Sequence, residues 1–184
     1  MNVLNYIADR KSPLAFSHDP VDEELIRLLF TAAGKAPSGF NAQPWHFILT
    51  RRGERGYEAL LRTLSAANAQ WAGDAPLLVL VTTRKIYPGR GENHFASYEA
   101  GLAVGNLLVQ ASAAGLSVHQ MGGYDKEAAR RLFGIPGEFD LLVLMAIGYH
   151  GDPLSLPDDL RERELNSSSR KELGDILTEG IPFS

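Results

Sequence analysis

A polar turn within residues 36–47 carries residue types suited to hold a ligand. Ser38 and Asn41 can hydrogen-bond either a ligand or their own backbone. Gly39 permits positive φ, while Pro37 and a second proline before the following strand restrict the backbone and reduce the entropy lost on binding. The segment predicts a binding loop for a flat polar ligand. Ordinary turn chemistry between a helix and a strand is the competing interpretation.

Hydrophobic periodicity predicts the elements that position this loop. Asp22 is suited to cap a helix whose apolar residues recur at three- and four-residue spacing up to residue 36. A strand is expected over residues 46–50 and a second helix over 57–71. Residues 77–82 are continuously apolar, which is typical of a strand buried on both faces.

The remaining pattern alternates strands and helices, followed by a looser C-terminal region. A mobile loop is expected over 86–95, a helix over 98–114, a strand over 117–120, a helix over 126–133 ended by Gly134, a strand over 141–147, and a last short helix over 170–177. No G-x-G-x-x-G follows a predicted strand, which disfavours a dinucleotide-binding Rossmann domain.

The helix expected over 98–114 is apolar or small almost all round. Such a helix is predicted to be buried on most faces, at the centre of the fold or at an interface. Gly101 and Gly105 would allow another helix to approach closely, and Asn106 and Gln110 need partners if they are buried. A membrane span needs about 20 apolar residues, and this helix is shorter and contains polar residues, so a membrane span is disfavoured.

Length and composition indicate a single domain over residues 1–184. The chain is 45% hydrophobic and 22% charged, as in ordinary globular proteins. It has 18 basic and 22 acidic residues, a net charge of −4, and no long basic tract, which argues against a nucleic-acid surface. With no cysteine, disulfides and thiolate chemistry are excluded, which fits a cytoplasmic protein. No secretory signal is evident.

Side-chain catalysis has little support in the sequence. No two of the five histidines show helical metal-ligand spacing, so no metal site is predicted. Ser38 lies outside a nucleophile-elbow context and has no evident histidine and acid partners. Any redox chemistry must therefore come from a cofactor.

The order of motifs resembles the FMN-dependent nitroreductase family. The basic triplet Arg10, Lys11 and Ser12 is followed by an amphipathic helix that leads directly into the P-S-x-x-N-x-Q-P-W segment from Pro37. Residues 115–125 resemble the family segment beside the flavin ring. The resemblance is strongest over residues 10–47, and the combination of motifs is far more specific than either motif alone.

The resemblance implies an α+β fold, with a mixed central sheet flanked by helices in an intertwined homodimer. Residues from about 152–184 would form an arm that packs on the partner subunit. Two flavins would lie at the dimer interface. Each would accept hydride at N5 from NADH or NADPH and pass electrons to a nitroaromatic, quinone or similar small acceptor, with no catalytic side chain required.

The resemblance also assigns cofactor-binding residues. The basic triplet Arg10, Lys11 and Ser12 would hold the phosphate and ribityl groups, with Arg170 reaching the same phosphate. The loop residues Pro37, Ser38, Gly39 and Asn41 would close over the flavin of the partner subunit. A backbone amide at Gly122 or Gly123 would hydrogen-bond flavin N5, and Asn68 would face the pyrimidine edge. For Arg170 alone, a solvated surface charge is the competing interpretation, and for the two glycines it is an ordinary turn capped by Asp125.

One position departs from the family pattern. Well-known members carry a basic side chain four residues after the position of Arg10, where this chain has Leu14. A cation beside flavin N1 would stabilise the reduced anion, so Leu14 predicts a flavin that is harder to reduce unless another residue substitutes. A dimer that binds, stores or senses flavin without efficient NAD(P)H turnover is therefore the alternative function. A dehalogenase or flavin-fragmenting enzyme is a third interpretation, disfavoured by the short chain.

Overall fold

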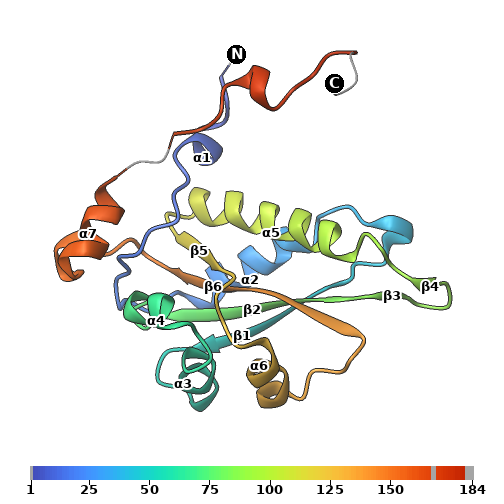
Figure 1. Ribbon diagram of the computed structural model, residues 1–184, viewed down its shortest axis with the longest axis horizontal. Helices are drawn as coiled ribbons and strands as arrows, with labels where there is room; N and C mark the ends of the chain where they lie inside the picture. Colours follow the sequence, from blue (N-terminus) through green and yellow to red (C-terminus); the bar gives the residue numbers. More distant parts are fainter. Residues whose placement is uncertain (1, 167–168, 181–184) are drawn as a thin grey trace.

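The computed structural model describes residues 2–166 and 169–180, and it places a four-stranded sheet between two layers of helices (Figure 1). The helices are α1 (Asn5–Ala8), α2 (Glu23–Ala33), η1 (Gly39–Asn41), α3 (Arg55–Leu61), α4 (Ala66–Ala72), α5 (Ala96–Ala113), α6 (Lys126–Phe133), η2 (Pro153–Ser155), α7 (Asp158–Leu165) and η3 (Leu173–Asp175). The strands are β1 (Trp45–Arg51), β2 (Leu77–Arg84), β3 (Ile86–Tyr87), β4 (Gly91–Glu92), β5 (Ser117–Met121) and β6 (Phe139–Gly148).

The main sheet has the strand order β1-β2-β6-β5. The α+β class is confirmed, but in place of the expected mixed sheet every pairing among the described strands is antiparallel. Between β1 and β2 the chain passes through α3 and α4 and re-enters the sheet beside the end of β1, where Leu77 pairs with Arg51. The Arg52 N–H also donates to the Pro76 carbonyl at 2.9 Å. This return to the same end of β1 makes β2 antiparallel to it.

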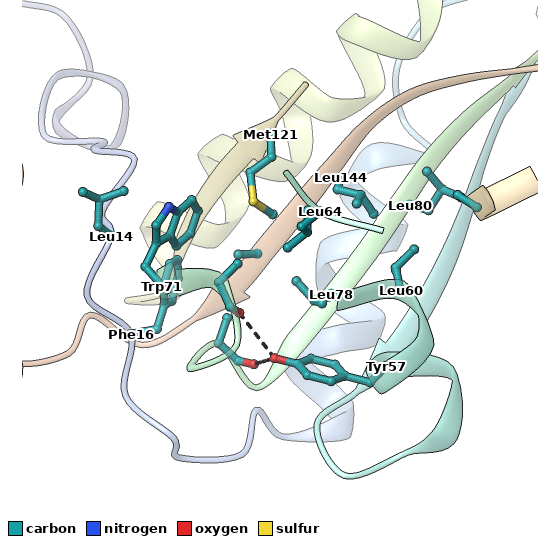
Figure 2. Packing of buried hydrophobic residues seen from close by; sticks show 14 of the residues in the cluster. Leu14, Phe16, Tyr57, Leu60, Leu64, Trp71, Leu78, Leu80, Met121 and Leu144 are labelled. Atoms are coloured by element: carbon teal, nitrogen blue, oxygen red, sulfur yellow. Dashed lines mark hydrogen bonds between the residues drawn. The ribbon is translucent and has the colours of Figure 1, made fainter. Parts of the chain in front are cut away.

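Strand β2 is apolar at successive positions because both of its faces are covered. Leu78 and Leu80 pack in the cluster that includes Tyr57 and Trp71 of α3 and α4 (Figure 2). Their neighbours along the strand point to the opposite face, where α2 and α5 cover the sheet (Figure 1). The side chains of a strand alternate between its faces, so a continuous apolar run is what a central strand between two helical layers requires.

The expected helix over 57–71 is wrong as a single element, because the chain breaks into α3 and α4. The Thr63 hydroxyl donates to the Leu60 carbonyl at 2.7 Å, and the Thr63 carbonyl accepts the Asp125 N–H at 2.8 Å. The Ser65 N–H donates to the Gly123 carbonyl at 2.9 Å. These long-range bonds use backbone groups that a continuous helix would have paired within itself.

Further differences from the sequence expectations lie in the loop and arm regions. Part of the expected mobile loop forms the short β3-β4 hairpin. The last helix expected over 170–177 is wrong, since only the 3-10 turn η3 forms there, while α7 lies in the looser C-terminal region where no helix was expected before residue 170. Near η3 the apolar side chains have no core to pack on, and Leu173 and Ile176 are 66% and 69% exposed.

Helix α6 forms as expected. The Asp125 side chain accepts the Ala128 N–H at 2.9 Å and caps its first turn. Gly134 ends it with φ +60°, a left-handed conformation that costs glycine little.

Helix α5 is buried on one face within its own chain, where the sequence predicted burial on most faces at the centre of the fold or at an interface. The buried face includes Ala100, Ala103 and Leu107. A Cβ atom added at Gly101 or Gly105 would meet no described atom within 4 Å, so none of the described helices uses the close approach that these glycines allow. Within the described residues, no helix has both the length and the apolar character needed to cross a membrane.

Candidate functional site

The N-terminal basic triplet and Arg170 line one cavity, although Ser12 and Arg170 are 158 positions apart in the sequence. The cavity has a volume of about 430 Å³. We call it the cationic cavity, and its polar or charged lining residues are Arg10, Lys11, Ser12, His119, Arg163, Glu164, Asn166 and Arg170. Four cations and one carboxylate leave three net positive charges when His119 is neutral.

The cations of this cavity are available for an anion. Within residues 2–166 and 169–180, none of the four cationic side chains forms an ion pair with a carboxylate. The Arg10 guanidinium donates to the Ser12 hydroxyl oxygen at 3.1 Å, which leaves the hydroxyl proton free to point at a ligand. Uncompensated arginines with a neighbouring hydroxyl form a set of donors suited to a phosphate group.

Glu164 attaches helix α7 to the segment that carries the basic triplet. One of its carboxylate oxygens accepts the Leu14 N–H at 2.5 Å, and the other lies 2.9 Å from His150 Nε2. The Glu164 side chain is only 6% exposed. Since α7 also carries Arg163, this carboxylate brings N-terminal and C-terminal cations to the same cavity.

The Leu14 side chain lies in the hydrophobic core near Trp71 and Phe16 (Figure 2). It is 5% exposed and also contributes apolar surface to the cavity. Among the described residues, position 14 therefore supplies a backbone donor and apolar packing where the family pattern has a cation.

His119, on β5, is a cavity residue that sequence reasoning missed. Its ring lies 4.4 Å from the Trp71 ring, and its Nδ1 lies 2.9 Å from the Pro13 carbonyl oxygen, which can only accept. Nδ1 therefore carries the proton. Burial lowers the pKa of His119, although the carbonyl partners oppose this effect.

The segment after β5 contacts α4. Asn68 Nδ2 donates to the Gly123 carbonyl at 3.0 Å. Gly122 and Gly123 are exposed, and in the described part of the chain their N–H groups donate to no protein acceptor. A Cβ at Gly123 would come within 2.9 Å of Ser65 Oγ, so only glycine fits without displacement. The tertiary contact thus leaves two backbone donors open to a ligand.

The binding loop, residues 37–43, forms a turn around η1. The Ser38 hydroxyl oxygen accepts the Gln43 N–H at 2.9 Å, so its own proton can be donated elsewhere. The Asn41 side chain makes no hydrogen bond to a described residue. Pro37 and Asn41 are exposed, and Gly39 is half-buried. The loop therefore presents a hydroxyl and an amide with unused hydrogen-bonding capacity.

The binding loop and the cationic cavity lie at opposite ends of α5. The Gly39 N–H donates to Glu99 in the first turn of α5, whereas Arg10 and Lys11 border a small pocket beside Ser112 and Gly115 at the other end (Figure 1). Helix α5 has 18 residues and is ~27 Å long. Within one chain, the loop and the cavity cannot hold the same small ligand in direct contact.

The antiparallel sheet flanked by helices, the cationic cavity and the glycine segment define an α+β protein with a cavity suited to an anionic ligand. Family comparison supports this class. The nitroreductase family model matches residues 7–67 and 57–149, and the chain belongs to this family.

Individual relatives agree with the family assignment. A protein from Methanothermobacter thermautotrophicus, provisionally named NADH dehydrogenase/NAD(P)H nitroreductase, is 30% identical over 158 residues, which cover 81% of this chain and 78% of the relative. An iodotyrosine deiodinase from Thermotoga neapolitana is 29% identical over 167 residues, covering 78% and 86%. A crystal structure described as an oxidoreductase containing FMN has a TM-score of 0.92 and 34% identity, and the match covers 98% of this chain and 93% of that one.

The deiodinase match bears on one expectation from the sequence. Chain length was expected to disfavour dehalogenation, yet this chain matches 86% of the length of a relative with that name. Length alone therefore does not exclude this reaction class.

Proposed function

We propose that this protein is a homodimeric FMN-dependent oxidoreductase that uses NADH or NADPH to reduce a nitroaromatic, quinone or similar small acceptor. The observation that carries the proposal is the cationic cavity, in which Arg10, Lys11, Ser12 and Arg170 converge from the two ends of the sequence. The cavity lies in a chain that belongs to the nitroreductase family.

The residues present fit an FMN phosphate. A phosphate monoester carries nearly two negative charges at neutral pH, and the lining supplies three net positive charges with N–H and O–H donors. Arg163 adds a cation that the sequence reasoning did not include. Arginine side chains can bind phosphate oxygens in a bidentate manner, which orients the cofactor as well as attracting it.

The glycine segment fits the ring end of the cofactor. Flavin, when bound, supplies the hydride chemistry by accepting at N5. We propose that a backbone N–H of Gly122 or Gly123 donates to that atom, since both are exposed and without a described acceptor. Asn68, held 3.0 Å from the Gly123 carbonyl, would orient this segment and face the pyrimidine edge. These groups position the ring without carrying a proton in the reaction.

A second copy of the chain would complete the site. The binding loop lies at the end of α5 away from the cationic cavity, so Pro37, Ser38, Gly39 and Asn41 would contact the flavin held by the partner subunit. The exposed α5 surface around Gly101 and Gly105 can accept a second chain at close range. Such closed, self-complementary pairing is the commonest form of oligomer.

The domain organisation fits the same dimer. We propose one domain over residues 1–184, with about 152–184 as an arm that packs on the partner subunit. The described segment 169–180 extends beyond the helices and sheet of its own chain (Figure 1). Its apolar side chains Leu173, Ile176 and Leu177 are all more than half exposed, and a partner would cover them.

Anaerobic visible spectroscopy tests the proposal directly. The purified protein is loaded with FMN, and spectra are recorded before and after adding NADH and then NADPH. Bleaching of the flavin absorbance supports the reductase and identifies the donor. Bound flavin that stays oxidised with both nucleotides would favour the alternative function of flavin storage or sensing, and absence of flavin binding would refute the proposal.

Reductive dehalogenation is a second candidate function, favoured by the match to an iodotyrosine deiodinase over most of that relative's length. The same cavity and glycine segment would hold the flavin. The test measures iodide release from iodotyrosine by the chemically reduced, flavin-loaded protein, beside its reduction of a nitroaromatic and a quinone. The faster reaction shows whether the acceptor is a halogenated aromatic or a nitro or quinone compound.

A further inference from the structure

We propose that Glu99 is a positioning residue that fixes the binding loop in the conformation that meets the flavin of the partner subunit. The inference rests on the proposed function and names a residue that the cofactor itself does not touch. Glu99 lies in the first turn of α5 and is only 4% exposed. A buried carboxylate is costly unless it is well hydrogen-bonded, so its partners indicate what it does.

Both partners of the Glu99 carboxylate are donors. Oε1 accepts the Gly39 N–H at 2.6 Å, and Oε2 accepts from Asn93 Nδ2 at 2.9 Å. A carboxylate offers two acceptor oxygens, whereas an amide at this position would offer one acceptor and one donor. Glu99 therefore matches a site that needs two acceptors.

The orientation of Asn93 is also fixed. Its Oδ1 accepts the Phe95 N–H at 2.9 Å, so the amide group must present its NH₂ to Glu99. Asn93 is 4% exposed, and its own N–H donates to the Lys85 carbonyl at 2.6 Å. A chain of hydrogen bonds thus runs from the start of α5 through Asn93 and Glu99 to Gly39.

The loop held by this chain has a strained backbone. Phe40, Asn41 and Gln43 have φ values of 54°, 55° and 47°, in the left-handed region that residues other than glycine rarely adopt. Strain of this kind persists only where surrounding contacts hold it, and it is concentrated at functional sites. The Glu99 bond to Gly39 immediately precedes the strained residues and is the buried charged contact of the loop.

The β3-β4 hairpin supports the same conformation from outside. Tyr87 contacts the Phe40 ring edge-on at a centroid distance of 5.5 Å, and the Arg90 guanidinium lies 4.3 Å from the centre of that ring. A Cβ at Gly39 would come within 2.9 Å of the Tyr87 hydroxyl oxygen. The Ser38 hydroxyl proton and the Asn41 side-chain amide have no hydrogen-bond partner among the described residues, so a ligand can use them.

Complementary substitutions test the inference. In E99Q the new side-chain NH₂ faces the donor of Gly39 or of Asn93. In N93D the new carboxylate faces the carboxylate of Glu99. The double variant N93D/E99Q restores every donor–acceptor pair, because the new carboxylate at 93 accepts from Phe95 and from the new amide at 99, whose oxygen accepts from Gly39. Glu92→Gln, at an exposed hairpin carboxylate, is the matched control.

Two readouts are measured for each variant. The first is FMN affinity by fluorescence quenching, together with kcat at saturating FMN. The second is hydrogen exchange of the Gly39 amide in flavin-free protein, which needs no cofactor. We expect E99Q and N93D to weaken FMN binding on the order of tenfold and to speed Gly39 exchange, with kcat at saturating FMN nearly unchanged. The double variant should recover both readouts to within about threefold.

The contrary results are distinct. Wild-type FMN affinity and Gly39 protection in E99Q would overturn the inference, as would a double variant no better than E99Q. If E99Q does not fold, the double variant should still fold, and its failure would also overturn the inference. If the wild-type protein binds no FMN, the proposed function fails, while the exchange data still decide whether Glu99 fixes the loop.

Discussion

Replacing Arg10 with alanine should weaken FMN binding much more than riboflavin binding. Arg10 lines the cationic cavity and holds the Ser12 hydroxyl at 3.1 Å, so its loss removes one cation and the orientation of one donor. The net charge of the cavity falls from +3 to +2. Riboflavin lacks the phosphate, so its affinity reports only on the ring and ribityl contacts.

The expected magnitude follows from the kind of bond that is lost. A hydrogen bond to a charged group contributes ~1.5–3 kcal/mol. Since 1.4 kcal/mol is tenfold in affinity, Arg10→Ala should raise the Kd for FMN by about 10- to 100-fold. Arg10→Lys keeps the charge but loses the planar pair of donors, so it should fall between wild type and alanine.

The assay is flavin fluorescence quenching at a fixed ionic strength of ~0.15 M, where the screening length is about 8 Å. Arg161→Ala is the matched control, because Arg161 lies on α7 but pairs with Asp158 and is not part of the cavity lining. An FMN Kd for Arg10→Ala within twofold of wild type, or an equal loss of riboflavin affinity, would refute the assignment of the cavity to the phosphate.

Four further measurements test other parts of the structure. Tyr57→Phe removes a hydroxyl that donates to the Ala75 carbonyl at 2.6 Å (Figure 2), and it should lower the free energy of unfolding by ~1–3 kcal/mol and the Tm by about 2–4 °C per kcal/mol. Tyr124→Phe is the control, because the buried Tyr124 hydroxyl has no hydrogen-bond partner among the described residues and its removal breaks no such bond. Equal denaturation curves for the two variants would contradict this reasoning. Burial raises the pKa of Tyr124 to about 12, so the unfolded chain loses its proton first and stability should fall as pH rises from 10 toward 12, less steeply in Tyr124→Phe. Burial lowers the pKa of His119 below 6.5, so in acid the unfolded chain binds a proton at this residue more readily than the folded chain. The free energy of unfolding, measured by urea titration, should therefore decrease below about pH 6.5. In His119→Gln it should depend less steeply on pH. Leu14→Lys should raise the flavin midpoint potential by placing a cation at the cavity, at some cost in stability because Leu14 is 5% exposed; an unchanged potential in a folded, flavin-loaded variant would reject the electrostatic role of this position.

Local signals in the sequence were sufficient for many individual elements. The positions of β2 and α6 follow from a continuous apolar run and from the caps Asp125 and Gly134, which act within a few residues. The break between α3 and α4 was not predictable in this way. It depends on backbone bonds from Thr63 and Ser65 to residues about 60 positions away.

The candidate site shows the same division. The basic triplet, the binding loop and Arg170 could be identified from residue types and motif order. His119 and Arg163 carried no motif, and they join the cavity only because β5 and α7 pack beside the N-terminal segment. Glu99 likewise reads as an ordinary acidic residue at the start of a helix, and its role depends on Gly39 and Asn93 arriving from two other segments.

The sequence by itself determined the family, the alternation of helices and strands, and the residues with phosphate-binding chemistry, because these depend on side-chain type and short spacing. Only the tertiary structure decided that Ser12 and Arg170 share a cavity and that the binding loop lies at the other end of α5. Contacts between residues far apart in the chain depend on the packing of the whole core, and local periodicity carries no information about them. For that reason the separation of the two halves of the site came from the fold, and it adds a structural argument for the second subunit that the family resemblance had already implied.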